Sequence, residues 1–326
     1  MKEVARLAGV STMTVSRALT SPGRLSEQTL RRVREVIDRI GYVPNRVAGN
    51  LSSDRTTLVA LIVPNLRNAI LAETIKGIND VLFKHDFQLM ISDCANSPVI
   101  EEKLVRTYLA QQVCGIILHN TMHTPGTKTV LRAAGIPCVE TGNLIASPLD
   151  MIVSYSNSAA GSAMARHFAE RGYRRPGLIT LKIRDRERIR AARRGFLAGL
   201  RTAGLSIDRN AILEVDAGLE SAGKGMAQLL EAAPRTDAVY LVGDVLAAGA
   251  LFECQRRGLR VPDDIALASS DDSEWLANLI PAMTTVRYPR YEIGVQAAQA
   301  IVDSALGRRH PLRLDLGFEI LQRQST

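Results

Sequence analysis

Residues 2–19 read KEVARLAGVSTMTVSRAL, and residues 40–48 read IGYVPNRVA. The first stretch predicts a short helix, a turn at Gly9 and a second helix capped by Ser11. Glycine adopts the left-handed turn readily, and a serine hydroxyl accepts a hydrogen bond from a free backbone N–H. A third helix is expected after Ser26. This helix-turn-helix arrangement places its second helix in the major groove of DNA, so the sequence predicts an all-α DNA-binding head.

The head is expected to contact DNA through its two capped helix starts. The cap and first turns of the second helix supply six candidates: Ser11, Thr12, Met13, Thr14, Ser16 and Arg17. Arg17 is the leading candidate for reading a base, because a guanidinium pairs with both major-groove acceptors of a guanine. A phosphate or intrahelical contact is its alternative role, since most protein–DNA hydrogen bonds go to the backbone. Ser26 and Thr29 are predicted to bind phosphate through hydroxyl and helix N-terminal N–H groups.

Charge is concentrated in the head. Residues 1–57 contain ten Lys and Arg against five Asp and Glu, whereas the whole chain has a net charge of +8. A basic head on a nearly neutral remainder fits a polyanionic partner, although a basic solvated surface would have the same composition. We assign residues 1–43 to the helix-turn-helix head, residues 44–57 to a hinge segment and residues 58–326 to a body.

Length and composition restrict the class of protein. A chain of 326 residues suits two or three domains. The four cysteines are far apart and lack zinc-type spacing, so buried free thiols in a reducing cytoplasm are expected. No apolar run approaches about 18 residues, and no charged segment leads into an apolar region at the start. We therefore expect a cytoplasmic protein with no membrane partner.

The body alternates short apolar runs with amphipathic stretches. The predicted strands are Leu58–Val63, Phe87–Ser92, Gly115–His119, Pro137–Glu140, Met151–Ser154, Leu178–Leu181, Ile212–Val215, Ala238–Val242, Ile265–Ser269 and Thr284–Val286. Alternation of strand and helix predicts parallel sheets covered on both faces, and about ten strands suit two doubly wound lobes. The first lobe is expected to span about residues 58–155 and 288–312, and the second about residues 156–287 and 313–326. Ligands of such sheets bind outside the carboxyl ends of the strands.

No catalytic chemistry stands out in the body. No phosphate-binding glycine motif follows a strand, and no Ser-His-Asp or metal cluster is evident among five scattered histidines. His119 and His123 could form a metal pair, but a pair without carboxylate support is more often a pocket or surface feature. We therefore expect no catalytic residue, no metal and no cofactor. A sugar-processing α/β enzyme remains the alternative of a different class.

Several sequence blocks resemble the lactose/galactose repressor family of bacterial transcription regulators. They are AGVS at 8–11, TVSR at 14–17, GYVPNR at 41–46, PNLRNAILAE at 64–73, GLRVPDDIA at 258–266 and TTV at 284–286. The resemblance implies a body like the periplasmic sugar-binding proteins, which forms a homodimer and closes around a small effector. It also implies a hinge helix that folds on operator DNA and opens the minor groove with a leucine. The matching hinge residues are Asn45, Arg46, Ala48 and Leu51.

The resemblance also suggests an effector site. The matching pocket positions are Ile70, Leu71, Asn120, Asp244 and Asp271. The aromatic platform that many relatives have near Gly218 is absent, which predicts a pocket without such a platform. Ala192 stands where the family has an effector-binding arginine, so Arg188 or Arg190 is expected to take over that role. A guanidinium in the cleft would favour an anionic effector, because arginine binds carboxylates in fork geometry.

Three further blocks resemble the gluconate-utilisation branch of the family: HTP at 123–125, FECQRRGL at 252–259 and LDLGF at 314–318. The resemblance implies a homodimeric repressor that binds a palindromic operator and responds to a sugar acid. Gluconate, a ketogluconate or a phosphorylated relative would fit. A co-repressor-dependent regulator, or an activating one that docks a partner protein, is the alternative, because these differ only in the sign of coupling between sites.

Overall fold

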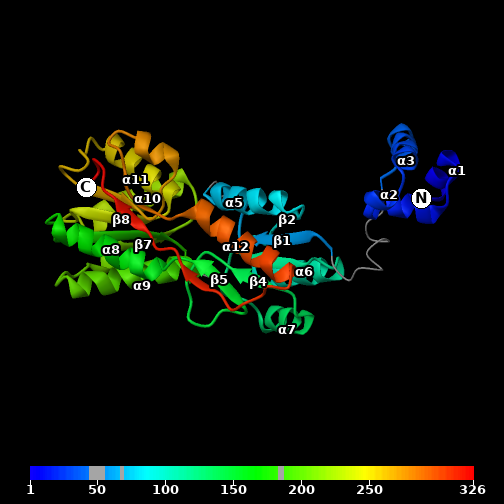
Figure 1. The fold of residues 1–326 in the computed structure, drawn as a ribbon. Coiled ribbons are helices and arrows are strands. Elements are labelled where there is room, and N and C mark those ends of the chain that lie inside the picture. Colours follow the sequence, from blue (N-terminus) through cyan, green and yellow to red (C-terminus); the bar gives the residue numbers. More distant parts are fainter. Residues whose placement is uncertain (44–55, 67–69, 183–186) are drawn as a thin grey trace. The chain divides into compact units, whose positions relative to one another are not determined.

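The computed structural model describes residues 1–43, 56–66, 70–182 and 187–326. These fall into two compact units, Met1–Thr56 and Thr57–Thr326. Figure 1 shows the helical first unit and the sheets of the second.

The described residues 1–43 of the first unit form three helices and one short 3-10 turn: α1 (Lys2–Ala8), α2 (Thr12–Thr20), η1 (Pro22–Arg24) and α3 (Glu27–Ile40). Gly9 ends α1 with a φ of +62°, the left-handed conformation that glycine adopts without strain. The Ser11 hydroxyl accepts a hydrogen bond from the Thr14 N–H at 3.1 Å, and Ser26 caps α3 in the same way. A small core holds the helices together: Val4, Ala5, Ala8, Val15, Ala18, Val33 and Val36.

The second unit contains two six-stranded sheets. The first sheet has the order β11 (Arg313–Asp315), β5 (Met151–Ser154), β4 (Cys138–Glu140), β3 (Gly115–Leu118), β1 (Leu58–Val63) and β2 (Gln88–Asp93). The second has the order β12 (Glu319–Leu321), β10 (Thr284–Arg287), β9 (Ala266–Ser269), β8 (Ala238–Val242), β6 (Pro176–Leu181) and β7 (Ile212–Val215). All pairs are parallel except β10 with β12. The predicted class, a helical head followed by two doubly wound lobes, is confirmed.

Helices cover both faces of each sheet (Figure 1). In the first lobe they are α5 (Leu71–Lys84), α6 (Pro98–Ala110), α7 (Pro125–Ala134) and α12 (Arg290–Ala305). In the second they are α8 (Asn157–Glu170), α9 (Glu187–Thr202), α10 (Leu219–Ala232) and α11 (Asp244–Arg256), with short turns η3 (Arg209–Ala211) and η4 (Glu274–Asn278). The helices pack in pairs, α12 against α5, α8 against α9 and α10 against α11.

The lobe boundary near the end of the chain needs correction. Residues 313–326 were expected in the second lobe, but β11 pairs with β5 in the first sheet, and only β12 joins the second. Two strands of three residues, separated by a turn at Gly317, are too short to give a periodic signal. The chain therefore crosses between the lobes three times, after β5, after β10 and between β11 and β12.

Candidate functional site

The helix-turn-helix unit presents the predicted DNA-contact residues on its surface. Ser11, Thr12, Met13 and Arg17 are exposed, and the Met13 side chain is 63% accessible. Thr14 and Ser16 are half-buried beside them, because Val15 between them points into the core. Ser26 is exposed at the start of α3, and its hydroxyl lies 2.9 Å from that of Thr29. Both capped helix starts therefore face solvent with polar groups. The predicted hinge contacts, Asn45, Arg46, Ala48 and Leu51, lie outside the described residues.

A cavity of about 480 Å³ lies between the two lobes of the body. Segments that follow β1, β3, β6, β8 and β9 line it, because the carboxyl ends of both parallel sheets open onto it. Five of the predicted effector residues border it: Ile70, Asn120, Arg188, Asp244 and Asp271. Leu71 is buried in the core instead. Arg190 does not line the cavity either, and its guanidinium lies 3.9 Å from Met122 Sδ and 3.9 Å from a Glu187 carboxylate oxygen.

Arg188 is a half-buried cation at the wall of this cavity. Its Nη1 donates to Nε2 of His119 at 3.2 Å, and His119 Nδ1 lies 2.8 Å from the Thr141 hydroxyl. Burial, together with the charges of Arg188 and Arg290, holds the pKa of His119 well below its usual range, so the ring is a neutral acceptor. Among the described residues no carboxylate forms an ion pair with Arg188. Within the described ranges, the hydrogen-bond partner of the Arg188 guanidinium is therefore a neutral ring and not a carboxylate.

The backbone of α9 is held tightly where it carries Arg188. A Cβ added to Gly195 would lie 1.9 Å from the carbonyl oxygen of Ser158 in α8, so the two helices approach at van der Waals distance only because that side chain is absent. Gly161 on α8 has the same relation to the Ala192 carbonyl, at 2.2 Å. These two glycines therefore allow the close packing of α9, the helix that carries Arg188, on α8.

Three carboxyl residues of the second lobe border the cavity: Glu187, the first residue of α9, Asp244 and Asp271. Asp244 is the first residue of α11, where it accepts hydrogen bonds from the Val245 N–H at 2.8 Å and from the Ser273 hydroxyl. Burial and the neighbouring charge of Asp271 raise the pKa of Asp244. Asp271 follows β9 and forms an ion pair with Arg290, the first residue of α12. The cavity thus combines carboxyl acceptors with the Arg188 cation.

The expectation of a cavity without an aromatic platform is wrong. Trp275, the only tryptophan of the chain, lies on η4 and borders the cavity with 39% of its surface exposed. Tyr155 and Tyr288 also border it, with ring centroids 3.8 Å apart and planes inclined by 18°. The sequence reasoning looked for an aromatic side chain near Gly218, whereas these rings come from other segments. It also missed Arg290, because nothing in the sequence links that residue to Asp271.

The two histidines considered as a metal pair have separate partners. His123 lies between two carboxylates, with Nδ1 2.5 Å from a Glu101 oxygen and Nε2 3.1 Å from a Glu140 oxygen. Burial alone would lower the pKa of His123, but its hydrogen bonds to Glu101 and Glu140 raise the pKa to about 9. Nowhere in the described parts of the chain do three or more His, Cys, Asp or Glu groups converge in a way that could hold a metal ion. His123 is therefore a buried cation whose partners are two glutamates of the same chain.

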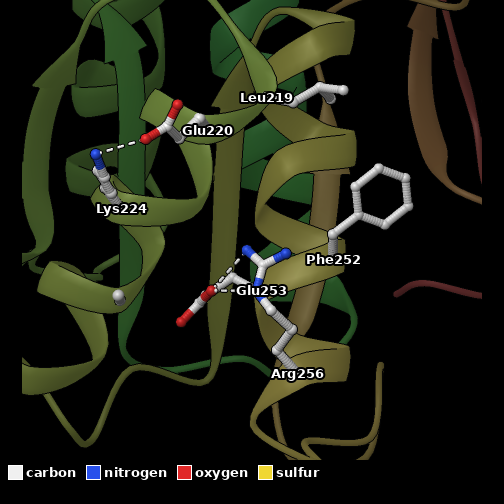
Figure 2. Close-up of a pocket in the computed structure, with 7 residues that line it drawn as sticks. Leu219, Glu220, Lys224, Phe252, Glu253 and Arg256 are labelled. Atoms are coloured by element: carbon white, nitrogen blue, oxygen red, sulfur yellow. Dashed lines mark hydrogen bonds and ion pairs between the residues drawn. The ribbon is translucent and has the colours of Figure 1, made fainter.

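A second hollow, of about 490 Å³, lies on the surface of α10 and α11. Figure 2 shows Leu219 and Phe252 on these neighbouring helices, with charged groups around them. Those charges are paired locally, Lys224 with Glu220 at 2.7 Å and Arg256 with Glu253 at 2.7 Å. Because these charged groups pair with one another, Leu219 and Phe252 are the large side chains of this hollow that have no polar or charged partner among the described residues.

The four cysteines of the chain lie in the body. All four cysteines are free, and Cys94, Cys138 and Cys254 are buried while Cys114 is half-buried. No helix in the described ranges is both long enough and apolar enough to cross a membrane.

Comparison with known proteins gives the family. The profile of the bacterial regulatory proteins of the lacI family matches residues 1–45, and that of the periplasmic binding protein-like domain matches residues 165–326. The chain is 35% identical to the HTH-type transcriptional regulator GntR of Pseudomonas aeruginosa, over 100% of this chain and 95% of that protein. The chain therefore belongs to the lacI family of bacterial transcription regulators.

Two further relatives agree with this assignment. The HTH-type transcriptional regulator GntR of Escherichia coli K12 is 31% identical over 98% of this chain and 96% of its own length. A crystal structure of a LacI family transcriptional regulator from Silicibacter pomeroyi is 32% identical, covers 99% of this chain and 98% of its own, and superposes with a TM-score of 0.92. The predicted family is confirmed, and the chain is a transcriptional repressor of this type with DNA-binding and ligand-binding parts, not an enzyme.

Proposed function

We propose that this repressor binds its operator under the control of a small sugar acid held between the two lobes. Gluconate, a ketogluconate or a phosphorylated relative is the proposed effector. The observation that carries the proposal is Arg188, whose guanidinium borders the cavity with a neutral histidine as its hydrogen-bond partner. A carboxylate would supply the missing counter-charge in a bidentate contact.

Other groups around the cavity favour the same ligand chemistry. Ile70, Gly218 and Gly243 border it at the starts of α5, α10 and α11, and helix N-termini attract anions through their free N–H groups. Asp271 and Asn120 offer acceptors and donors for hydroxyl groups. A ligand with one acid group and several hydroxyls would match this arrangement. The resemblance of three sequence blocks to the gluconate-utilisation branch supports it independently.

On the DNA side, we propose that the start of α2 reads a half-site in the major groove. Arg17 would contact a base edge, and Ser26 with Thr29 would bind phosphate. The hinge residues proposed to follow the minor groove are Asn45, Arg46, Ala48 and Leu51, with Leu51 as the wedge between base pairs. A palindromic operator requires two copies of the head, related by a two-fold axis.

A homodimer would also cover apolar surface on the body. Phe83 and Val99 of the first lobe are more than two-thirds exposed, and Ile280 of the second lobe is 84% exposed. Leu219 and Phe252 border the hollow of Figure 2. We propose that a second copy of this chain covers some of these exposed apolar side chains, because exposed apolar surface favours association. Sedimentation equilibrium of the full chain measures this, and a monomer at micromolar concentration would contradict it.

The effector proposal is tested by ligand titration of the full chain. Trp275 borders the cavity and is the only tryptophan, so its fluorescence reports binding at that site. We expect gluconate or a ketogluconate to bind at least tenfold more tightly than glucose. Arg188→Gln should remove this preference for the acid. Arg194→Gln, at an exposed position on the same helix, is the matched control and should retain it.

Arg190→Ala separates the two arginines considered from the sequence. The Arg190 side chain does not border the cavity, so we expect acid binding to survive this change. Tight binding of glucose with no response to either acid would refute the sugar-acid proposal. Gel shifts on operator DNA, with and without the bound acid, then give the sign of the response.

A further inference from the structure

The effector cavity contains an ion pair that joins the two lobes. Arg290 Nη2 binds Oδ1 of Asp271, and the Arg290 side chain is only 11% exposed. Asp271 Oδ2 accepts a hydrogen bond from the Ser270 hydroxyl at 3.3 Å. Both oxygens of the Asp271 carboxylate therefore have a partner, and Ser270 and Asp271 both border the cavity.

The two partners belong to different lobes. Arg290 begins α12, which packs on α5 and on β3, β4 and β5 of the first sheet. Asp271 directly follows β9 and Ser270 in the second sheet. The orientation of this second-lobe carboxylate thus depends on a first-lobe cation.

Arg290 is itself fixed. Its guanidinium carbon lies 5.2 Å from the centroid of the Tyr288 ring, a cation–π distance, and Tyr288 stacks on Tyr155. Burial would lower the pKa of Arg290, but the surrounding Tyr155, Asp271 and Tyr288 raise it, so it stays protonated. A cation placed under two rings that line the cavity has little freedom to leave its carboxylate.

We propose that Arg290 is a positioning residue of the effector cavity, which holds Asp271 as an ionised, oriented acceptor for a hydroxyl group of the ligand. This inference rests on the proposed function. Arg188 is proposed to bind the acid group of the effector, and Arg290 would orient Asp271 toward its hydroxyl groups. Without Arg290, the Asp271 carboxylate would lose the cation that binds it and would keep the neighbouring Asp244 carboxyl. Repulsion between like charges favours protonation of one of the two groups, and a carboxylate without its ion-pair partner is no longer held in one orientation.

The charged and titratable groups that surround Asp271 come from four elements. Arg290 approaches from α12, Asp244 from α11 and Tyr240 from β8, while Tyr288 lies on the crossover after β10. Burial and the charge of Asp271 raise the pKa values of Asp244, Tyr240 and Tyr288, whereas the charge of Arg290 lowers the pKa values of Asp244 and Tyr288. Removal of the Arg290 charge should therefore change the pH at which ligand affinity is lost on the acid side of the binding profile, its acid limb.

The test titrates gluconate into the full chain through Trp275 fluorescence, from pH 4.5 to 8. Arg290→Gln should weaken binding at least tenfold and move the acid limb of the binding profile to higher pH. Arg290→Lys, which keeps the charge, should recover part of the affinity and the original pH profile. Arg287→Gln changes an exposed arginine at the end of β10 and is the matched control. Its affinity should equal that of the unmodified chain.

A double-variant cycle separates positioning from a general loss of fold. If Arg290 acts through Asp271, Arg290→Gln combined with Asp271→Asn should bind no more weakly than Asp271→Asn alone. Additive losses, or an Arg290→Gln variant with unchanged affinity and pH profile, would overturn the inference. If the unmodified chain binds glucose and no acid, the sugar-acid proposal fails, and the same cycle run with glucose still tests Arg290, because its role concerns hydroxyl groups.

Discussion

The buried His123 should make the stability of the body decline at alkaline pH. Its side chain is 1% exposed and lies between the carboxylates of Glu101 and Glu140. Burial acts against protonation, but the hydrogen bonds and charges of the two glutamates prevail and raise the pKa of His123 to about 9. In the unfolded chain a histidine has a pKa of about 6.5.

The sign and size of the effect follow from linkage. Because the pKa is higher in the folded protein, the protonated ring contributes stability that is fully present below about pH 6.5 and is lost as the pH rises through about 9. The difference between the two pKa values corresponds to about 3 kcal/mol of unfolding free energy. This is a large part of the free energy of unfolding of a typical protein, which is on the order of 10 kcal/mol.

The assay is urea unfolding followed by circular dichroism between pH 6 and 10, for the unmodified chain and for His123→Gln. Burial raises the pKa of Cys94 to about 11, so this thiol also destabilises the fold at high pH, but equally in both proteins. The difference in free energy of unfolding between the two proteins therefore reports on His123. This difference should shrink by about 3 kcal/mol from pH 6 to pH 10. His310→Gln, at an exposed histidine, is the control. Curves that stay parallel from pH 6 to 10 would refute the reasoning.

Three other changes test the head, the hinge and the body. Arg17→Ala should weaken operator binding by about 1–3 kcal/mol and relax the preference at one base position, measured on single-base operator variants; an equal loss on all sequences would make Arg17 a phosphate contact. Leu51→Ala should reduce both operator affinity and DNA bending in a circular-permutation gel shift, and an unchanged bend would remove the wedge. Gly195→Ala should destabilise the body by about 1–3 kcal/mol in urea, because its Cβ would lie 1.9 Å from the Ser158 carbonyl. Gly23→Ala, with open space around the added atom, is its control.

The sequence predicted most elements because their signals are local. Leu58–Val63 is a continuous apolar run, and it forms the buried central strand β1. Ser11 and Ser26 are strong caps, and both accept the expected backbone hydrogen bond. The family resemblance placed Asn120 and Asp271 at the effector site, and both border the cavity, where the parallel strands of each sheet end at one edge.

The features that escaped prediction depend on contacts between distant segments. Arg290 and Asp271 meet only because the crossover after β10 returns the chain to the first lobe beside the end of β9. His123 could be seen as a titratable residue, but its partners come from α6 and β4, and no spacing rule connects them. Trp275 lies on a short 3-10 turn and not at a strand end, so strand patterning could not place it at the cavity.

The three crossovers between the lobes are linked by aromatic contacts, and this bears on how a ligand in the cavity would act at a distance. Tyr155 lies after β5, Tyr288 after β10 and Phe318 between β11 and β12. Tyr288 stacks on Tyr155 at 3.8 Å and meets Phe318 edge-on at 6.5 Å. Since the rings are packed together, a change in the angle between the lobes must move all three crossovers at once. Tyr155 and Tyr288 also border the cavity, so a ligand that contacts them can favour one arrangement of all three crossovers over another. A ligand couples two sites only when it binds one arrangement of the protein more tightly than the other.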